Sequence, residues 1–364
     1  MSRLTQTRTA VHDAASGLAQ RREALSSAHH LMLALVIIGQ LLSFGAMYLL
    51  PAAATACWIA VLLQAVPLLA LRLLGQALRR TAPASAGTTR RYRLAAGGMA
   101  LLFFTNMNVS LLSLTELTHT FFFPGDSRLP LVLTAAVALG LGIPRSPAAV
   151  PGTARLLRWF LAAGFLFCAA TVLPTGESGY LYPLWGYGSS HTLRCAVRGA
   201  GGVWAAGSLA VILPEERDSH PLRGALPSLA GVGLTALFFL CCAYVLPGSE
   251  LSARWGYAPR LQLLMEMSPN TLSWSLMLMA EMLLYLTAFS VCADLMRASL
   301  RQALGRTLPL LPFTLLCVPL SMRGIGACEE LLCALLPWRF PLAAALMLMC
   351  LPGNLIARKK GKKP

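Results

Sequence analysis

The chain has 364 residues, of which 56% are hydrophobic and only 12% are charged. Soluble domains carry roughly 25% charged residues, so this composition excludes an ordinary soluble protein. The formal net charge of +16 would favour nucleic-acid binding in a soluble chain, but a membrane topology explains it better. The sequence contains no nucleotide-binding loop, metalloprotease motif, nucleophile elbow or C-x-x-C pair. It therefore predicts no enzyme, no cofactor and no metal site.

About ten apolar stretches follow one another along the chain. Stretches such as 31–50 and 225–247 reach the length of about 20 residues that a helix needs to cross a bilayer. Backbone amides in lipid must find partners within their own segment, so these stretches are predicted to be helices. The expected spans are 29–50, 52–78, 94–122, 129–144, 156–174, 195–213, 225–247, 271–297, 307–322 and 338–357.

The basic residues indicate the topology. Most of the 30 Lys and Arg fall in alternate loops, as the positive-inside rule requires of cytoplasmic segments. This predicts a cytoplasmic N-terminal segment (1–28), a ten-span transmembrane domain (29–357) and a basic cytoplasmic tail (358–364). The basic residues assigned to the outer side are Arg128, Arg194, Arg198, Arg254, Arg260, Arg323 and Arg339.

Glycines interrupt the first span and the sixth span. The first contains Gly39 and Gly45, and the sixth contains Gly199, Gly201, Gly202 and Gly207. Glycine costs about 1 kcal/mol relative to alanine inside a helix. Interrupted spans at matching places in two halves are typical of the binding site of an inverted-repeat transporter. Alternatively, the small residues only let neighbouring helices approach closely.

One acidic residue is predicted near the middle of the membrane. Glu281 lies about ten residues into the eighth span, and Tyr285 follows one turn later on the same face. A charge at mid-bilayer costs at least about 2.5–3.5 kcal/mol, so such groups normally face a partner or a cavity. Glu281 would contact a ligand amine or carry a proton; a structural hydrogen bond between helices is the alternative.

Other polar residues have weaker signals. Glu116 and His119 lie near the outer end of the third span, where anchoring of a helix or a place in the vestibule is favoured over ligand binding. Asn106 lies nearer the middle of the same span and either contacts a ligand or bridges two helices. Arg198 precedes the glycines of the sixth span, where it would attract a carboxylate or simply face water.

Several segments together resemble the GerAB-type spore germination proteins, a branch of the amino acid–polyamine–organocation transporter superfamily. They are SSAHHLMLALVIIGQLLSFGAMYLLP, SLLSLTELTHTFFFPGDSRLPLVL, YLYPLWGYGSSHTLRCAVRGAGGVWAAGSLAVILPEERD and GYAPRLQLLMEMSP, followed by the tail IARKKGKKP. The order and spacing of these patterns carry the resemblance. The family usually has a basic residue in its eighth span, where this chain has Glu281 and Asp294 instead.

The resemblance implies a LeuT-like bundle with a 5+5 inverted repeat. It also implies the membrane subunit of a spore germinant receptor, which senses a small nutrient such as an amino acid and acts with other receptor subunits in the spore inner membrane or cytoplasmic membrane. A secondary transporter of amino acids or related small organic solutes is the alternative, and an assembly subunit with a vestigial pocket is a third. The expected ligand-binding residues are Gly39, Ser43, Gly45, Asn106, Arg198, Gly201, Gly202, Trp204, Glu281 and Tyr285.

Overall fold

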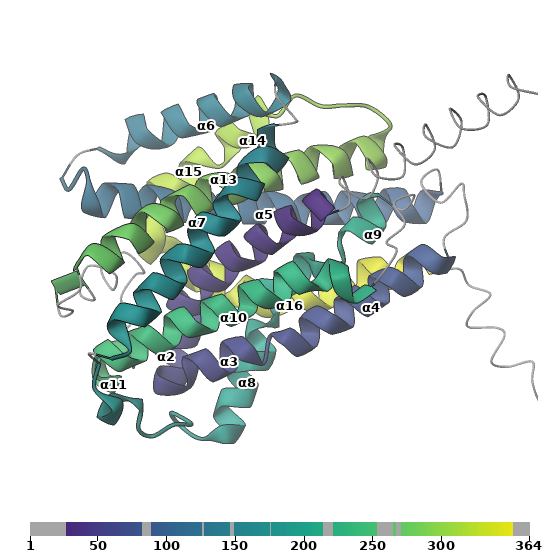
Figure 1. Ribbon diagram of the computed structural model, residues 1–364. Helices are drawn as coiled ribbons and strands as arrows, with labels where there is room; N and C mark the ends of the chain where they lie inside the picture. The colour runs from purple at the N-terminus through teal and green to yellow at the C-terminus, as the bar shows by residue number, and fades with distance from the viewer. Residues whose placement is uncertain are drawn as a thin grey trace, which may run out of the picture.

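The computed structural model shows a bundle of helices (Figure 1). It describes residues 27–81, 89–125, 127–145, 149–174, 176–213, 221–252, 265–266 and 271–351. No β-strand occurs in these ranges. The predicted N-terminal segment and basic tail lie almost wholly outside them, as does most of the interfacial loop before the eighth span.

Seven helical runs among the described residues are long and apolar enough to cross a membrane. One of them, Ser27–Thr81, is 55 residues long and holds the first two predicted spans. Two shorter apolar helices, Arg128–Gly142 and Leu311–Met322, complete the set. The observed segments thus correspond to the ten expected ones, and the two short helices correspond to the short predicted spans 129–144 and 307–322, whereas the span predicted at 156–174 is longer than expected.

The first span forms the centre of the bundle. It is an α-helix over residues 27–44, continues as a π-helix over Gly45–Leu49 (η1) and ends in α2 (Leu50–Ala53). Its side chains are buried around almost the whole circumference, as expected of a helix that is apolar on every face. The chain then reverses at Ala54, whose φ of 48° ends the helix. It returns through η2 (Ala54–Ala56), α3 (Cys57–Leu62) and α4 (Ala65–Thr81).

The remaining helices pack in two groups. The first group consists of α5 (Arg90–Phe121), α6 (Arg128–Arg145), α13 (Thr271–Leu304), α14 (Leu311–Leu316) and α15 (Val318–Met322). The second contains α3, α4, α8 (Ser189–Gly199), η5 (Ala200–Gly207), α9 (Leu209–Ile212) and α10 (Pro221–Val245). In Figure 1 the first group lies above the second.

Two long helices connect the groups. The helix α7 (Ala149–Val172) packs on both α13 and α10 and runs diagonally across Figure 1. The helix α16 (Gly324–Met349) packs on α5 from one group and on η5 and α4 from the other. The short elements η4 (Ser178–Leu181) and α11 (Gly248–Ser252) lie at the end of the bundle beside η2 and α2. Side chains on α16 therefore reach the interface between the two groups.

The last span differs from its prediction. Pro337 and Pro341 suggest a helix boundary near residue 338, but both prolines lie inside α16, which begins at Gly324. Prolines are tolerated in membrane helices where neighbouring groups satisfy the freed backbone. The prediction that Arg339 lies on the outer side is wrong. Arg339 is fifteen residues into α16, about 22 Å along its axis, and only 2% of its surface is exposed.

Candidate functional site

Two central spans depart from α-helical geometry at the places where glycines predict an interruption. In the first span the π-helix η1 starts at Gly45. In the sixth, α8 ends at Gly199 and continues as eight residues of 3₁₀-helix, η5. Runs of 3₁₀-helix longer than three or four residues are uncommon, and π-turns occur frequently at functional sites. The interruption in both spans is thus confirmed, as a change of helix type.

Close packing explains the glycines of the sixth span. A Cβ atom at Gly201 would overlap the backbone carbonyl oxygen of Leu336 on α16. At Gly202 a Cβ atom would come within 3.1 Å of Leu41 Cδ2 in the first span. Both readings of the sequence therefore apply here, since the same residues change the helix type and let two neighbours approach. The tight contact with Leu336 also fixes the position of α16 one turn before Arg339.

The Arg339 guanidinium lies at the centre of a buried polar cluster. Its Nη1 donates to Gln40 Oε1 at 2.8 Å and to Asn106 Oδ1 at 2.9 Å. Trp204 Nε1 donates to the same Asn106 oxygen at 3.4 Å. We call these four residues, Gln40, Asn106, Trp204 and Arg339, the central polar cluster. They come from four separate segments: the first span, α5, η5 and α16.

Aromatic rings enclose the central polar cluster. The guanidinium carbon of Arg339 lies 4.8 Å from the centre of the Phe44 ring, in cation–π contact. Phe103 meets the Trp204 ring edge-on, with 4.9 Å between centroids. Each member of the cluster is at most 2% exposed. A positive charge is therefore held in an apolar surrounding, where attraction to charge of the opposite sign is much stronger than in water.

A second polar level lies one turn further along the first span and about two turns further along α5. Ser43 and Ser113 share a hydrogen bond of 2.9 Å between the first span and α5, and Tyr285 on α13 places its hydroxyl beside both. Ser43 is three residues from Gln40, and Ser113 is seven from Asn106. The polar residues thus follow the interface between the first span and the first helix group.

Glu281 is fully buried, and it lies beside the second polar level, outside the central polar cluster. Its carboxylate lies near Cys168 on α7 and near Tyr285. On the same helix, Cys292 lies beside Asn106 and Arg339. The eleven residues from Glu281 to Cys292 span about 16 Å of helix. Glycines of the sixth span pack against α16 instead, and the charged group at that contact is Arg339.

The other predicted residues lie as follows. Gly39 packs against α13, where an added Cβ atom would meet Ala288 Cβ at 3.5 Å. Arg198 is exposed on α8 and lies beside the Tyr48 hydroxyl, so it stands apart from the central polar cluster. Thus Asn106 and Trp204 meet in that cluster, and Ser43 and Tyr285 form the second polar level.

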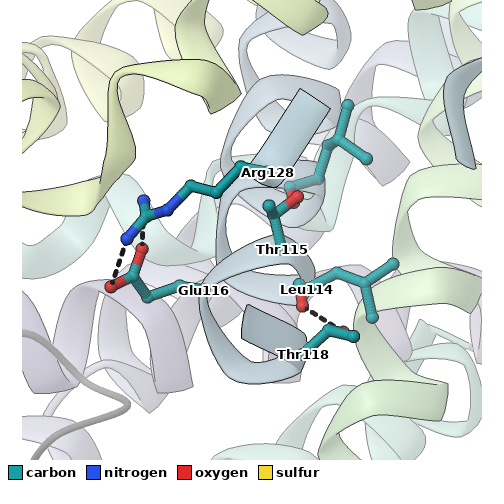
Figure 2. Close-up of polar contacts among 6 residues, drawn as sticks. Leu114, Thr115, Glu116, Thr118 and Arg128 are labelled. Atoms are coloured by element: carbon teal, nitrogen blue, oxygen red, sulfur yellow. Dashed lines mark hydrogen bonds and ion pairs between the residues drawn. The ribbon is translucent and has the colours of Figure 1, made fainter. Parts of the chain in front are cut away.

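Glu116 pairs with an arginine of the neighbouring helix. Its Oε2 accepts a hydrogen bond of 2.8 Å from Arg128 Nη1, and its Oε1 accepts a longer one of 3.5 Å from Nη2 (Figure 2). Arg128 is the first residue of α6, so the pair joins α5 and α6 across their connecting turn. This arrangement favours the anchoring role of Glu116. His119 is half-buried on the next turn of α5.

Two residues of the central polar cluster, Gln40 and Arg339, are not among the ligand-binding residues expected from the sequence. Arg339 lies between apolar runs, in ELLCALLPWRFPLAAALMLMC, and a charge in such a stretch is itself a sign of function. The flanking prolines hid this signal by moving the expected start of the helix. Gln40 follows Gly39 in the stretch LALVIIGQLLSF, where the other polar side chain is Ser43, and it is the one amide side chain there.

No group of three or more His, Cys, Asp or Glu side chains in the described ranges is arranged to hold a metal ion.

Among known proteins, similarity is found to solved structures and not to sequences. No family model matches the sequence, and no curated protein matches it.

Solved structures of a manganese transporter from Eremococcus coleocola are similar in fold. One mutant of that transporter, with a histidine replaced by alanine, matches with a TM-score of 0.50 at 12% identity, over 91% of this chain and 76% of that one. A second mutant, with a glutamate replaced by alanine, gives a TM-score of 0.50 at 13% identity, with the same coverage. Identity at this level establishes the fold alone. The chain is an all-α polytopic membrane protein with the LeuT-like transporter fold, in which ten segments form two inverted halves of five.

Proposed function

We propose that this protein is a secondary transporter that binds a small organic solute at the central polar cluster. The observation that carries the proposal is the convergence of four buried polar side chains from four separate segments, next to the stretches where two spans leave the α-helical form. Polar groups at membrane depth are expensive and mark substrate pathways. Half-helix ends and irregular backbone at the middle of the bilayer are typical of transporter sites.

The location of the cluster supports transport. Its hydrogen bonds connect the first span with α5 and α16, and the Trp204 bond connects η5 with α5. The Trp204 bond joins the two helix groups directly, and the Arg339 bonds join α5 of the first group and the first span to α16, which contacts both groups. Alternating access in such folds is largely the rocking of one group against the other around a fixed site. A solute bound here would touch both moving parts.

The charge of the cluster favours an organic solute over a metal cation. The structural relatives include a manganese transporter, but the charged group of the cluster in this chain is a guanidinium. Arginine offers five donors and no acceptor, so it cannot ligate a cation and repels one. We therefore do not carry the manganese substrate over to this chain.

Uptake into proteoliposomes tests the proposal. Asn106→Ala should abolish or strongly reduce saturable uptake, because Asn106 joins Arg339 and Trp204. Asn108→Ala is the matched control, since its Nδ2 donates only to the carbonyl oxygen of Phe104 on its own helix at 2.9 Å. Small amino acids, carboxylates and neutral amides serve as labelled solutes. Failure of all of them to accumulate above protein-free liposomes would reject the transporter proposal.

A germinant receptor is the second candidate, and it is supported by the resemblance of the sequence segments to GerAB-type proteins. In that case ligand binding at the same site causes a conformational change, and partner subunits respond to that change. Deletion of the gene in a spore-forming host would then delay germination on one class of nutrient while growth on that nutrient stays normal. Robust saturable uptake by the isolated protein, with germination unchanged by the deletion, decides for transport.

The membrane orientation follows from the arginine pattern as a further proposal. Both termini face the cytoplasm, because the basic residues outside the spans concentrate in the segments on that side. Because Arg339 is buried in the bundle, one basic residue fewer lies on the outer side, and the difference in basic residues between the two sides is larger. Labelling of single cysteines should find positions 85 and 361 on the cytoplasmic side and positions 180 and 252 outside. The opposite labelling would reverse the topology.

A further inference from the structure

The central polar cluster has a surplus of hydrogen-bond donors. Arg339 Nε and Nη2 are buried and have no hydrogen-bond partner among the described residues, and the same holds for Asn106 Nδ2. All three groups are N–H donors. Gln40 Oε1 accepts a hydrogen bond from Arg339 Nη1, and Asn106 Oδ1 accepts from both Arg339 Nη1 and Trp204 Nε1, so neither oxygen bonds the three unpartnered donors. What the cluster lacks is therefore an acceptor.

The cluster also lacks a negative charge. Within the parts of the chain that the structure describes, no Asp or Glu forms an ion pair with Arg339. Glu281, the buried carboxylate on the neighbouring helix, lies near Cys168, about 16 Å along α13 from the level of Cys292. A buried cation without a counter-charge is strongly unfavourable. Some other group has to compensate for this cost.

We propose that the central polar cluster is an anion site, and that the transported solute carries a carboxylate that binds Arg339. This inference rests on the proposed function and specifies its substrate class. The Nε–H group and the adjacent N–H of Nη2 form one edge of the planar guanidinium. That edge matches the two oxygens of a carboxylate in a bidentate pair, the strong form of such contacts. The Asn106 amide supplies a third donor.

The same geometry limits the rest of the solute. The amine and carboxylate of an α-amino acid are attached to one carbon atom, so a ligand held at Arg339 cannot also reach Glu281. Glu281 is therefore not the amine partner of this carboxylate. The groups next to the anion are the Phe44 and Trp204 rings and Cys292. This surrounding fits a small, apolar or neutral body on the carboxylate.

The first test uses the full chain in detergent and compares acetate with acetamide. These two molecules have nearly the same shape but differ in charge. Acetate should bind saturably by calorimetry and should raise the melting temperature with concentration, as a ligand specific for the folded state does. Acetamide should bind at least tenfold more weakly. Equal binding of the two would overturn the proposal. Binding of chloride in place of acetate would overturn the assignment to a carboxylate.

A second test supplies the missing charge from the protein itself. Asn106→Asp keeps the shape of the side chain and places a carboxylate on Arg339 Nη1. This variant should melt higher than the unsubstituted protein without ligand, and it should lose acetate binding at least tenfold. Asn108→Asp is the control and should keep acetate binding. If Asn106→Asp still binds acetate as tightly, Arg339 does not hold the anion.

A third variant separates the charge from the geometry. Arg339→Lys keeps a cation but removes the planar edge, so acetate should bind several-fold more weakly while acetamide stays unchanged. Unaltered acetate binding in Arg339→Lys would contradict the bidentate contact. Failure of the inference is distinguishable from failure of the transporter proposal. Saturable uptake of neutral solutes without any response to acetate refutes the anion site alone, whereas absence of all uptake refutes the transporter.

Discussion

The contact between Gly201 and α16 yields a prediction with a built-in control. A Cβ atom at Gly201 overlaps a backbone oxygen of Leu336, and a helix backbone cannot turn aside as a side chain can. Forcing extra volume into a packed interior costs about 1–3 kcal/mol. Alanine regains up to about 1 kcal/mol of helix propensity over glycine. Gly201→Ala should therefore destabilise the protein by up to roughly 2 kcal/mol.

Gly39→Ala is the matched variant. Gly39 is buried in the first span, and its added Cβ atom would lie 3.5 Å from Ala288 Cβ, an ordinary van der Waals contact. Only the propensity gain then applies, so Gly39→Ala should be neutral or stabilising by up to about 1 kcal/mol. The two substitutions are chemically identical, and the structure predicts opposite signs for them.

Thermal unfolding of the purified variants in one detergent measures the difference. Gly201→Ala should melt below the unsubstituted protein, and Gly39→Ala should melt at the same temperature or above it. Leu336 lies one turn before Arg339, so the shift in α16 should also weaken acetate binding in Gly201→Ala alone. A Gly201→Ala protein that melts and binds normally would show that α16 does not pack on η5 as described. Equal losses in both variants would reveal a general intolerance of these spans to alanine.

Three further predictions concern the polar contacts away from Arg339. A double-mutant cycle of Ser43→Ala and Ser113→Ala, measured by thermal unfolding, should give a coupling energy of about 0.6 kcal/mol, the average for hydrogen bonds between membrane helices. Additive effects of the two substitutions would contradict the 2.9 Å hydrogen bond between these side chains. Arg128→Gln should lower the free energy of unfolding by less than about 1 kcal/mol, because the ion pair of Arg128 with Glu116 is partly exposed. The substitution should leave acetate binding unchanged, and a loss of binding would place the ion pair in the path of the solute. Glu281→Gln should change the acetate dissociation constant less than twofold, given its distance from Arg339, and a tenfold change would refute that separation.

The fold and part of the site are readable in the sequence for physical reasons. Apolar length determines which segments span a membrane, and glycines report where a helix changes type or meets a close neighbour. Gly45 and Gly201 illustrate both effects. The sequence also points to Asn106 and Trp204, and both lie in the central polar cluster. A polar or aromatic residue in an otherwise apolar span can be recognised from the sequence of that span alone, without knowing which helices pack against it.

The partners of a buried charge are not a local property. Glu281 is buried as expected, but only the packing of α13 against α7 shows that it lies near Cys168. Arg339 escapes the sequence reasoning because two prolines are typical of a helix end in soluble proteins, whereas a membrane helix tolerates them. Its contact with Gln40 joins residues 299 positions apart. A contact of that range depends on how two helices cross, which composition and periodicity do not specify.

The magnitudes at Arg339 bear on how a carboxylate would drive a conformational change. A ligand shifts an equilibrium only by its differential affinity for two states, and a shift from 1:99 to 99:1 needs about 5.5 kcal/mol. Hydrogen bonds to charged groups contribute about 1.5–3 kcal/mol each, so the two unused Arg339 donors supply roughly 3–6 kcal/mol. That range reaches the required value only if both bonds form in one conformation and are lost in the other. Because α16 contacts both helix groups, a movement between the groups changes the surroundings of the guanidinium. The same difference in affinity would serve a transporter that releases its solute and a receptor that signals its presence.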